Sequence, residues 1–205
     1  MLHNLYIVDD DEAVRASLFR LVSRQPDYAV SSFASGDAFL EEFETLAPGV
    51  VLLDFHMAGA NGITVLHAIR ALSQRFVVVI LTAHGAIQRS VDAMKAGAFD
   101  FIEKPYDPAA LMMCLDLAFA ELARFRAEAD GRDSAVARLA LLSPRETEVL
   151  AGLGSGCSNK QIAWALKISP RTVEIYRANL MTKLKVRSLA ELLQLLFVAE
   201  LAMAA

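Results

Sequence analysis

Five short apolar segments, each followed by a stretch with helical periodicity, constrain the fold of the first 120 residues. The segments are rich in β-branched side chains, and the central ones are continuously apolar, as strands buried on both faces of a sheet must be. Between them, apolar residues recur at helical spacing. The alternation predicts an α/β fold with a doubly wound, five-stranded parallel sheet. The expected strands are residues 5–8, 29–33, 50–53, 76–81 and 98–102.

A domain boundary is expected soon after the fifth strand. Asp107 and Pro108 form an N-cap followed by proline at the first helical position, and apolar spacing continues to Phe125. Residues 126–136 then lose this periodicity and become charged and small. We therefore predict a first domain at 1–122 and a linker at 123–138, whose content of Ala, Arg and Glu favours a helix.

Residues 139–205 carry helical patterns and no strand signal. Ser143, Pro144 and Glu146 combine an N-cap, a proline at the first position and a capping-box acid. Ser158, Ser169 and Ser188 stand before three further apolar-periodic segments. This pattern predicts a second, all-α domain of four helices at 139–205.

Composition supports two packed domains and separates them by charge. Apolar residues make up 55% of the chain, enough for both cores. Residues 1–126 hold 10 Lys and Arg against 16 Asp and Glu, whereas 127–205 hold 10 against 8. Between residues 156 and 190, seven basic side chains face one acid, Glu174. An acidic half followed by a basic segment indicates a tethered nucleic-acid binder, the alternative being a helical packing module with solvated bases.

The chain shows no sign of export or of metal-binding cysteines. Its first residues lack a basic region followed by an apolar stretch, and no segment approaches the ~20 apolar residues that span a bilayer. We expect a cytoplasmic protein. Cys114 and Cys157 lack the paired spacing of a zinc site, so we interpret both as ordinary core or surface residues.

Polar residues gather at the carboxyl ends of the expected strands, where ligands bind in open parallel sheets. Residues 9–11 are three consecutive aspartates after the first strand, Asp54 follows the third, Thr82 the fourth, and the fifth leads to Lys104. Carboxylates placed together repel unless a cation neutralises them, and hard oxygen ligands suit Mg²⁺. A metal held by Asp10 and Asp54 could bridge a phosphoryl group, with Lys104 and Thr82 contacting its oxygens and Asp54 as nucleophile.

The segments VDDDEAVR, LLDFHMAGANG, ILTAHG and EKPYD resemble the flavodoxin-like receiver domain of response regulators, across residues 1–122. The resemblance implies a Mg²⁺ shell formed by Asp9, Asp10, Asp54 and the backbone carbonyl of His56. It also implies that Asp54 is the phosphoacceptor and that the switch residues are Thr82, Phe101 and Lys104. Ala58 replaces the usual proline, which leaves the loop less constrained. Lys104-Pro105 is similar to a cis bond of that family.

Phosphatases of the haloacid-dehalogenase type are the rival interpretation, because they also combine an Asp nucleophile with Thr and Lys on a parallel sheet. They require a general acid two residues after the nucleophile and a late acidic pair. Here His56 stands at the first position, and the acidic pair comes first. We therefore expect no enzymatic activity beyond slow self-dephosphorylation.

The segments LSPRETEVL, GCSNKQIAWAL and SPRTVEIYRANLMTKL are similar to LuxR-type helix-turn-helix domains, especially those of FixJ/NarL response regulators, across residues 139–197. The second helix of such a motif, here residues 171–184, lies in the major groove. Val173, Leu180 and Leu184 should be its buried stripe, and we expect Trp164 to be a core residue. The expected DNA-binding residues are Lys160, Arg171, Thr172, Glu174, Ile175, Tyr176, Arg177, Ala178 and Lys183. Glu174 could accept from cytosine N4 or orient a neighbouring arginine.

Together these features predict a two-component response regulator. A partner histidine kinase phosphorylates Asp54, the chain forms a homodimer, and it binds promoter DNA to regulate transcription, with RNA polymerase as a further candidate partner. The expected dimer interface comprises Arg89, Val91, Asp92, Lys95 and Phe99, although its apolar members could instead pack on the sheet. A constitutive DNA binder or kinase scaffold remains the alternative.

Overall fold

The computed structural model describes residues 2–72, 75–83 and 93–203. The chain forms two compact units, one up to Arg126 and one from Ala127 onward, each described here by itself. We call them the N-terminal and the C-terminal unit. No helix in these described ranges has the length and apolarity needed to cross a membrane.

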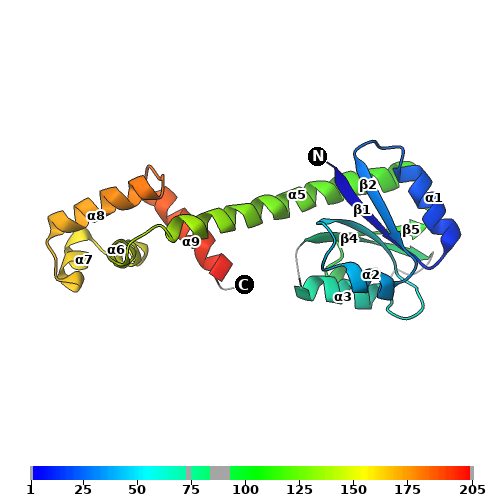
Figure 1. Cartoon of the computed structure of the whole chain (residues 1–205), viewed down its shortest axis with the longest axis horizontal. Coiled ribbons are helices and arrows are strands. Elements are labelled where there is room, and N and C mark those ends of the chain that lie inside the picture. Colours follow the sequence, from blue (N-terminus) through cyan, green and yellow to red (C-terminus); the bar gives the residue numbers. More distant parts are fainter. Residues whose placement is uncertain (1, 73–74, 84–92, 204–205) are drawn as a thin grey trace. The chain divides into compact units, whose positions relative to one another are not determined.

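The N-terminal unit is a parallel sheet with helices on both faces (Figure 1). The strand order is β2-β1-β3-β4-β5, and every neighbouring pair is parallel. This confirms the predicted α/β fold. Its elements are β1 (His3–Val8), α1 (Glu12–Val22), β2 (Tyr28–Phe33), α2 (Gly36–Glu42), β3 (Gly49–Asp54), α3 (Gly62–Leu72), β4 (Phe76–Ala83), β5 (Asp100–Lys104) and the start of α5 (Pro108–Leu139).

The fifth strand begins two residues later than predicted. The backbone N–H of Ala98 donates to the carbonyl of Ala93, so residue 98 still completes the preceding helical turn. Gly97 has a φ of 95°, a left-handed conformation that glycine adopts without strain. The ladder with β4 therefore starts at the pair Val79 and Asp100 rather than at Ala98.

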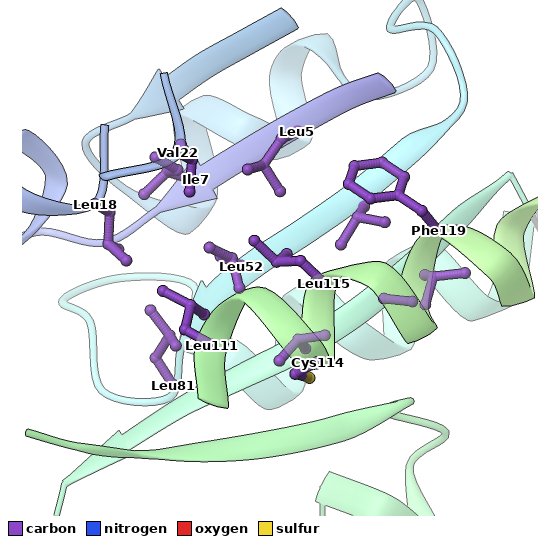
Figure 2. Close-up of a cluster of buried hydrophobic side chains, with 14 of the residues drawn as sticks. Leu5, Ile7, Leu18, Val22, Leu52, Leu81, Leu111, Cys114, Leu115 and Phe119 are labelled. Carbon is purple, nitrogen blue, oxygen red and sulfur yellow. The ribbon is translucent and has the colours of Figure 1, made fainter. Parts of the chain in front are cut away.

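Alternation along the central strands supplies two hydrophobic clusters, one on each face of the sheet. Leu5 and Ile7 belong to the cluster covered by α1 and α5, whereas Tyr6 and Val8 belong to the other. Figure 2 shows side chains of α5, including Leu115, packed toward β1 and β3 in the first cluster. Because both faces are covered, β3 is buried along its whole length, which explains why its residues 49–53 are continuously apolar.

Helix α5 is one continuous helix of 32 residues. Asp107 caps its start by accepting from the N–H of Ala110. The helix includes all of residues 123–138, the predicted linker, and the boundary between the two units falls within it, after Arg126.

The C-terminal unit contains the end of α5 and four further helices, as predicted. They are α6 (Pro144–Gly154), α7 (Asn159–Leu166), α8 (Pro170–Lys183) and α9 (Leu189–Met203). Ser143 and Ser158 form capping boxes with Glu146 and Gln161, and the Ser169 side chain accepts from the N–H of Thr172. These caps satisfy backbone donors that a helix start leaves unpaired.

Candidate functional site

Three carboxylates meet at the carboxyl ends of β1 and β3. Oxygen atoms of Asp9, Asp10 and Asp54 all lie within 4.8 Å of one another. Asp9 and Asp54 are buried, whereas Asp10 is exposed. The third consecutive aspartate, Asp11, instead caps α1 by accepting from the N–H of Ala13. Two of the three aspartates therefore face the site, and the third fixes the helix that follows.

Lys104 joins the two buried carboxylates. Its Nζ lies 2.7 Å from Oδ2 of Asp9 and 2.6 Å from Oδ1 of Asp54. The other oxygen of Asp54 accepts from the backbone N–H of His56 at 2.9 Å, and Oδ1 of Asp9 accepts from the N–H of Asp11. Each buried carboxylate thus has a cation on one oxygen and a backbone donor on the other, which offsets the cost of burial.

The electrostatics of the pair follow from burial and from these contacts. Burial raises the pKa of Asp54 above its ordinary value, although the hydrogen bond and charge of Lys104 oppose the shift. Burial also disfavours the charged form of Lys104, but hydrogen bonds to Asp54 and Asp9 outweigh it and raise its pKa. Lys104 therefore remains an ammonium paired with both buried carboxylates.

Two glycines allow the loop after Asp54 to pass close to its neighbours. A Cβ on Gly62 would lie 2.6 Å from the carbonyl oxygen of Asp54, so glycine is needed where α3 begins. Gly59 has a φ of 76°, and a Cβ there would meet the carboxylate of Asp37. That carboxylate also accepts from the N–H of Ala60. The loop that flanks the site is therefore held from α2.

Ala58, which stands where the resemblance leads one to expect proline, takes part in the site. Its backbone N–H donates to Oδ2 of Asp10 at 3.4 Å. Proline has no N–H and could not make this bond. The substitution therefore adds a weak donor to one of the three carboxylates.

The other predicted switch residues lie on β4 and β5. Thr82 is buried at the end of β4, in register with Glu103, and Ala83 is in register with Lys104. Phe101 lies on β5 with 42% of its surface exposed. The Lys104–Pro105 peptide bond is cis, as the resemblance implied. The strand-end residues singled out in the sequence are thus brought together at one edge of the sheet.

Only part of the predicted dimer interface can be placed. Arg89, Val91 and Asp92 lie outside the described residues. Lys95 is exposed, but Phe99 is half-buried and packs against the cluster formed by β1, β3, α1 and α5. Phe99 therefore follows the alternative interpretation, in which an apolar residue packs on the sheet.

In the C-terminal unit, α8 separates a buried stripe from an open face. Val173 and Leu180 of α8, and Leu184 just after it, are fully buried, as predicted. The opposite side is exposed and comprises Arg171, Glu174, Ile175 and Ala178. Ile175 has 55% of its surface exposed. Ile175 therefore adds an apolar side chain to an exposed face that also carries Arg171 and Glu174.

The remaining expected DNA contacts have more varied surroundings. Arg177 and Lys160 line one cleft together with Ser158 and Asn159 at the start of α7. Thr172 is half-buried beside the Ser169 cap, its hydroxyl 2.8 Å from that of Ser169. Two further predicted contacts, Tyr176 and Lys183, also meet other parts of the unit. Tyr176 packs partly against the hydrophobic core, and Nζ of Lys183 lies 2.7 Å from Oε2 of Glu146.

The expectation that Trp164 is a core residue is wrong. Its side chain is 86% exposed. Ile162 and Ala163 are buried and Leu166 is half-buried, so these three residues fill the side of α7 that faces the core. With a helical repeat of 3.6, Trp164 then points away from it.

Two exposed apolar surfaces were missed in the sequence. Leu189, Leu193 and Phe197 recur every four residues along α9 and are 37%, 38% and 63% exposed. Met113 and Leu117, four residues apart on α5, are 67% and 57% exposed. The i, i+4 spacing was visible in the sequence, but it also fits a buried stripe. Only the packing of the other residues shows that these face outward.

Comparison with known proteins gives matches to both units. Residues 5–116 match the response regulator receiver domain, and residues 140–196 match the bacterial regulatory proteins of the luxR family. The transcriptional regulatory protein FixJ of Azorhizobium caulinodans is 40% identical over 198 residues, which cover 97% of this chain and 93% of FixJ. FixJ of Bradyrhizobium diazoefficiens is 43% identical, covering 94% and 93%.

Two solved structures of response regulators are similar to this chain over nearly its whole length. The response regulator StyR has a TM-score of 0.80 at 36% identity, covering 96% of this chain and 98% of StyR. Full-length FixJ from B. japonicum has a TM-score of 0.60 at 39% identity, covering 97% and 98%.

Proposed function

The chain belongs to the FixJ-like response regulators, which regulate transcription through a receiver and a LuxR-type DNA-binding domain, and we propose that Asp54 is its phosphoacceptor. The observation that carries this proposal is the pairing of Lys104 with both Asp54 and Asp9. A nucleophilic carboxylate needs a nearby cation to accept the negative charge of an incoming phosphoryl group.

The proposed transfer forms an acyl phosphate on Asp54. An oxygen of Asp54 attacks the phosphorus of the phosphodonor, the bond from phosphorus to the donor breaks, and an acyl phosphate forms on Asp54. Lys104 and the hydroxyl of Thr82 then contact the new phosphoryl oxygens. A histidine kinase is the donor that the receiver domain implies.

The carboxylate cluster fits Mg²⁺ by the chemistry of its donors. Hard oxygen ligands converge from Asp9, Asp10 and Asp54, and we assign the backbone carbonyl of His56 to the same shell. When bound there, Mg²⁺ would supply positive charge that offsets the charge of the carboxylates and of a phosphoryl group. Lys104 supplies one positive charge to two buried carboxylates, so one negative charge remains uncompensated. A bound cation would offset it.

DNA binding is assigned to the open face of α8 together with the start of α7. Arg171, Glu174, Ile175 and Ala178 are exposed on this face, and we assign them to base edges or the adjacent phosphates. Lys160 and Arg177 share one cleft and are assigned to the DNA backbone. Lys183 is assigned a structural role, because its charge is already paired with Glu146.

Dimerisation is assigned to exposed apolar side chains in both units. The receiver surface comprises the apolar Met94, Phe101, Met113 and Leu117 together with the basic Lys95, and the α9 stripe comprises Leu189, Leu193 and Phe197. Exposed apolar side chains such as these are suited to burial between associating chains. Phosphorylation need only favour the dimerising conformation by a few kcal/mol.

Intact mass measurement after incubation with acetyl phosphate and Mg²⁺ tests the phosphoacceptor. Wild type should gain one phosphate, and Asp54→Asn should gain none. Chelation of Mg²⁺ should abolish the gain. Phosphate retained on Asp54→Asn would overturn the assignment, and a wild type that gains none would favour a constitutive DNA binder.

A further inference from the structure

A groove in the C-terminal unit is lined by the end of α5, by the turn after α8 and by α9. Gly131, Ala135 and Arg138 line it from α5 at helical spacing, Lys185 lines it from the turn, and Val198 lines it from α9. Its volume is about 320 Å³, at the lower end of the range for small-molecule sites. The groove is therefore large enough for a small organic molecule and too small for a folded partner.

The groove is basic and leaves one hydrogen-bond donor unused. Among the described residues that line it, Arg138 and Lys185 are opposed by one acid, Glu191. One carboxylate oxygen of Glu191 already accepts from the backbone N–H of Arg187 at 2.8 Å. The Nε of Arg138 is buried and finds no acceptor within the part of the chain that the structure describes. Buried polar groups in proteins nearly always have a hydrogen-bond partner, so this guanidinium indicates a site for an anion.

Gly131 keeps one end of the groove open. It lies in the interior of α5, where glycine is less stabilising than alanine. Its φ is not in the left-handed region, and a Cβ on it would meet no atom within 4 Å. Neither backbone geometry nor close packing therefore requires glycine here. Its effect is to leave space beside the groove that a side chain would occupy.

The rest of the lining determines which anion fits. The groove's apolar side chains are all aliphatic, and within the described residues no aromatic ring lines it; they are Ala135, Val186, Leu195 and Val198. Such a lining suits an aliphatic chain rather than a bare inorganic ion. Glu191 would repel a second negative charge on the same molecule. The combination favours a ligand with one carboxylate and a short hydrocarbon chain.

We propose that this groove binds a small aliphatic monocarboxylate. The carboxylate accepts from the guanidinium of Arg138, turned slightly toward the groove, and from the ammonium of Lys185, while the hydrocarbon chain lies over the aliphatic lining. Because the groove is lined from both α5 and α9, the bound ligand holds the end of α5 against α9. The site uses neither the carboxylate cluster around Asp54 nor the open face of α8, and it goes beyond the proposed function.

The first experiment titrates the full chain with hexanoate at constant ionic strength and follows backbone amide chemical shifts by NMR. We expect saturable shifts centred on the groove residues of α5 and α9. Hexanol, which lacks the charge, and inorganic phosphate, which lacks the chain, should each bind about tenfold more weakly, as expected for losing one substantial contribution. Absence of saturable hexanoate binding overturns the proposal. Hexanol or phosphate binding as tightly as hexanoate overturns the assigned ligand class.

The second experiment repeats the hexanoate titration with variants. Arg138→Met should weaken binding about tenfold, the effect of losing a hydrogen bond between charged groups. Arg145→Met is its matched control, because Arg145 lies in the same unit, outside the groove, and is paired with Glu148. Gly131→Leu should also weaken binding, because its side chain would enter the open space beside the groove, whereas the smaller Gly131→Ala should retain it.

Gly131 is exposed, so Gly131→Leu tests the site even if Arg138→Met fails to fold. Hexanoate binding by Gly131→Leu that equals wild type overturns the proposal, and so does equal weakening by Arg145→Met and Arg138→Met. Phosphate uptake and DNA affinity of Gly131→Leu are measured in parallel without hexanoate and should equal those of wild type. A chain that takes up phosphate and binds DNA but not hexanoate would overturn this inference alone.

Discussion

The Nζ of Lys183, in the last turn of α8, lies 2.7 Å from the buried Oε2 of Glu146, in the first turn of α6. The same carboxylate oxygen accepts from the N–H and the hydroxyl of Ser143. One carboxylate therefore completes the capping box of α6 and fixes the end of the helix that we assign to DNA. The sequence suggested the capping box but not the ion pair.

Replacing Lys183 with Met should destabilise the C-terminal unit. The change leaves the buried carboxylate of Glu146 without its cation, and we expect a loss of about 1 kcal/mol because Lys183 is itself half-exposed. Urea unfolding followed by circular dichroism measures the difference. Lys185→Met removes a nearby exposed charge and serves as control, and equal losses in both variants would contradict the role of the pair.

The stability of the same unit should depend on pH through Glu146. The hydrogen bond from Lys183, with those from Ser143, lowers the pKa of Glu146 from 4.5 to about 2. A carboxylate with a lowered folded-state pKa stabilises the fold above its unfolded pKa and loses this contribution as the pH falls. Wild type should therefore be more stable than Glu146→Gln above pH 4.5, with the difference shrinking toward pH 2. A constant difference across this window would show that Glu146 acts through packing alone.

Restoring proline at position 58 tests the contribution of the Ala58 N–H. Ala58→Pro removes the donor to Asp10 and restricts the loop, so Asp10 is freer to bind a cation. We expect Mg²⁺ affinity to rise about two- to fivefold, the effect of a compatible proline worth about 0.4–1 kcal/mol. Calorimetric titration with Mg²⁺ measures it. Ala60→Gly in the same loop is the control, and weaker binding by the proline variant would refute the prediction.

Much of the fold and the acidic site could be predicted from the sequence because buried strands and strand-end carboxylates leave local signals. Residues 49–53 of β3 are apolar because both faces are covered, and Asp54 is the last residue of the strand. The start of β5 could not be placed, because it depends on the hydrogen bond from Ala98 back to Ala93. Such a bond is a property of the folded backbone and leaves no hydrophobic pattern.

The orientation of Trp164 was mispredicted for a different reason. Hydropathy assigns a tryptophan to the core, but three other residues of α7, Ile162, Ala163 and Leu166, already occupy the core-facing positions. A helical wheel of these residues would have placed Trp164 outside. The pairing of Lys183 with Glu146 had no such signal, because the two residues are 37 positions apart.

Substitutions of residues that contact the DNA backbone should affect DNA binding differently from substitutions of residues that contact bases. Arg177→Ala and Lys160→Ala should weaken binding on all sequences alike, and each should reduce the salt slope by about 1, because these residues share a cleft at the start of α7. Glu174→Gln should instead change the preferred base at one position if Glu174 reads cytosine. Selection from random duplexes with titrations at several salt concentrations measures both. Unchanged base preference in Glu174→Gln would favour a role in orienting a neighbouring arginine.

Dimerisation should depend more on the exposed apolar side chain of Leu117 than on the charge of Lys95. Leu117 on α5 is an apolar side chain that is 57% exposed, whereas Lys95 is an exposed, charged side chain. If apolar burial drives association, Leu117→Lys should abolish the dimer that forms on phosphorylation, because an unpaired charge is costly in a dry interface. If steering by charge dominates, Lys95→Glu should have the larger effect.

Sedimentation of the phosphorylated and unphosphorylated chain, with phosphate uptake measured alongside, distinguishes these cases. Phe19→Lys is the control, because Phe19 is 44% exposed on α1, which lies on neither proposed dimer surface. We expect wild type and the control to become dimeric on phosphorylation and Leu117→Lys to remain monomeric with normal phosphate uptake. A dimer content independent of phosphate in wild type would move regulation away from the receiver surface. The α9 stripe would then be the remaining site, and Phe197→Lys would abolish the dimer in both states, because Phe197 is the most exposed member of that stripe.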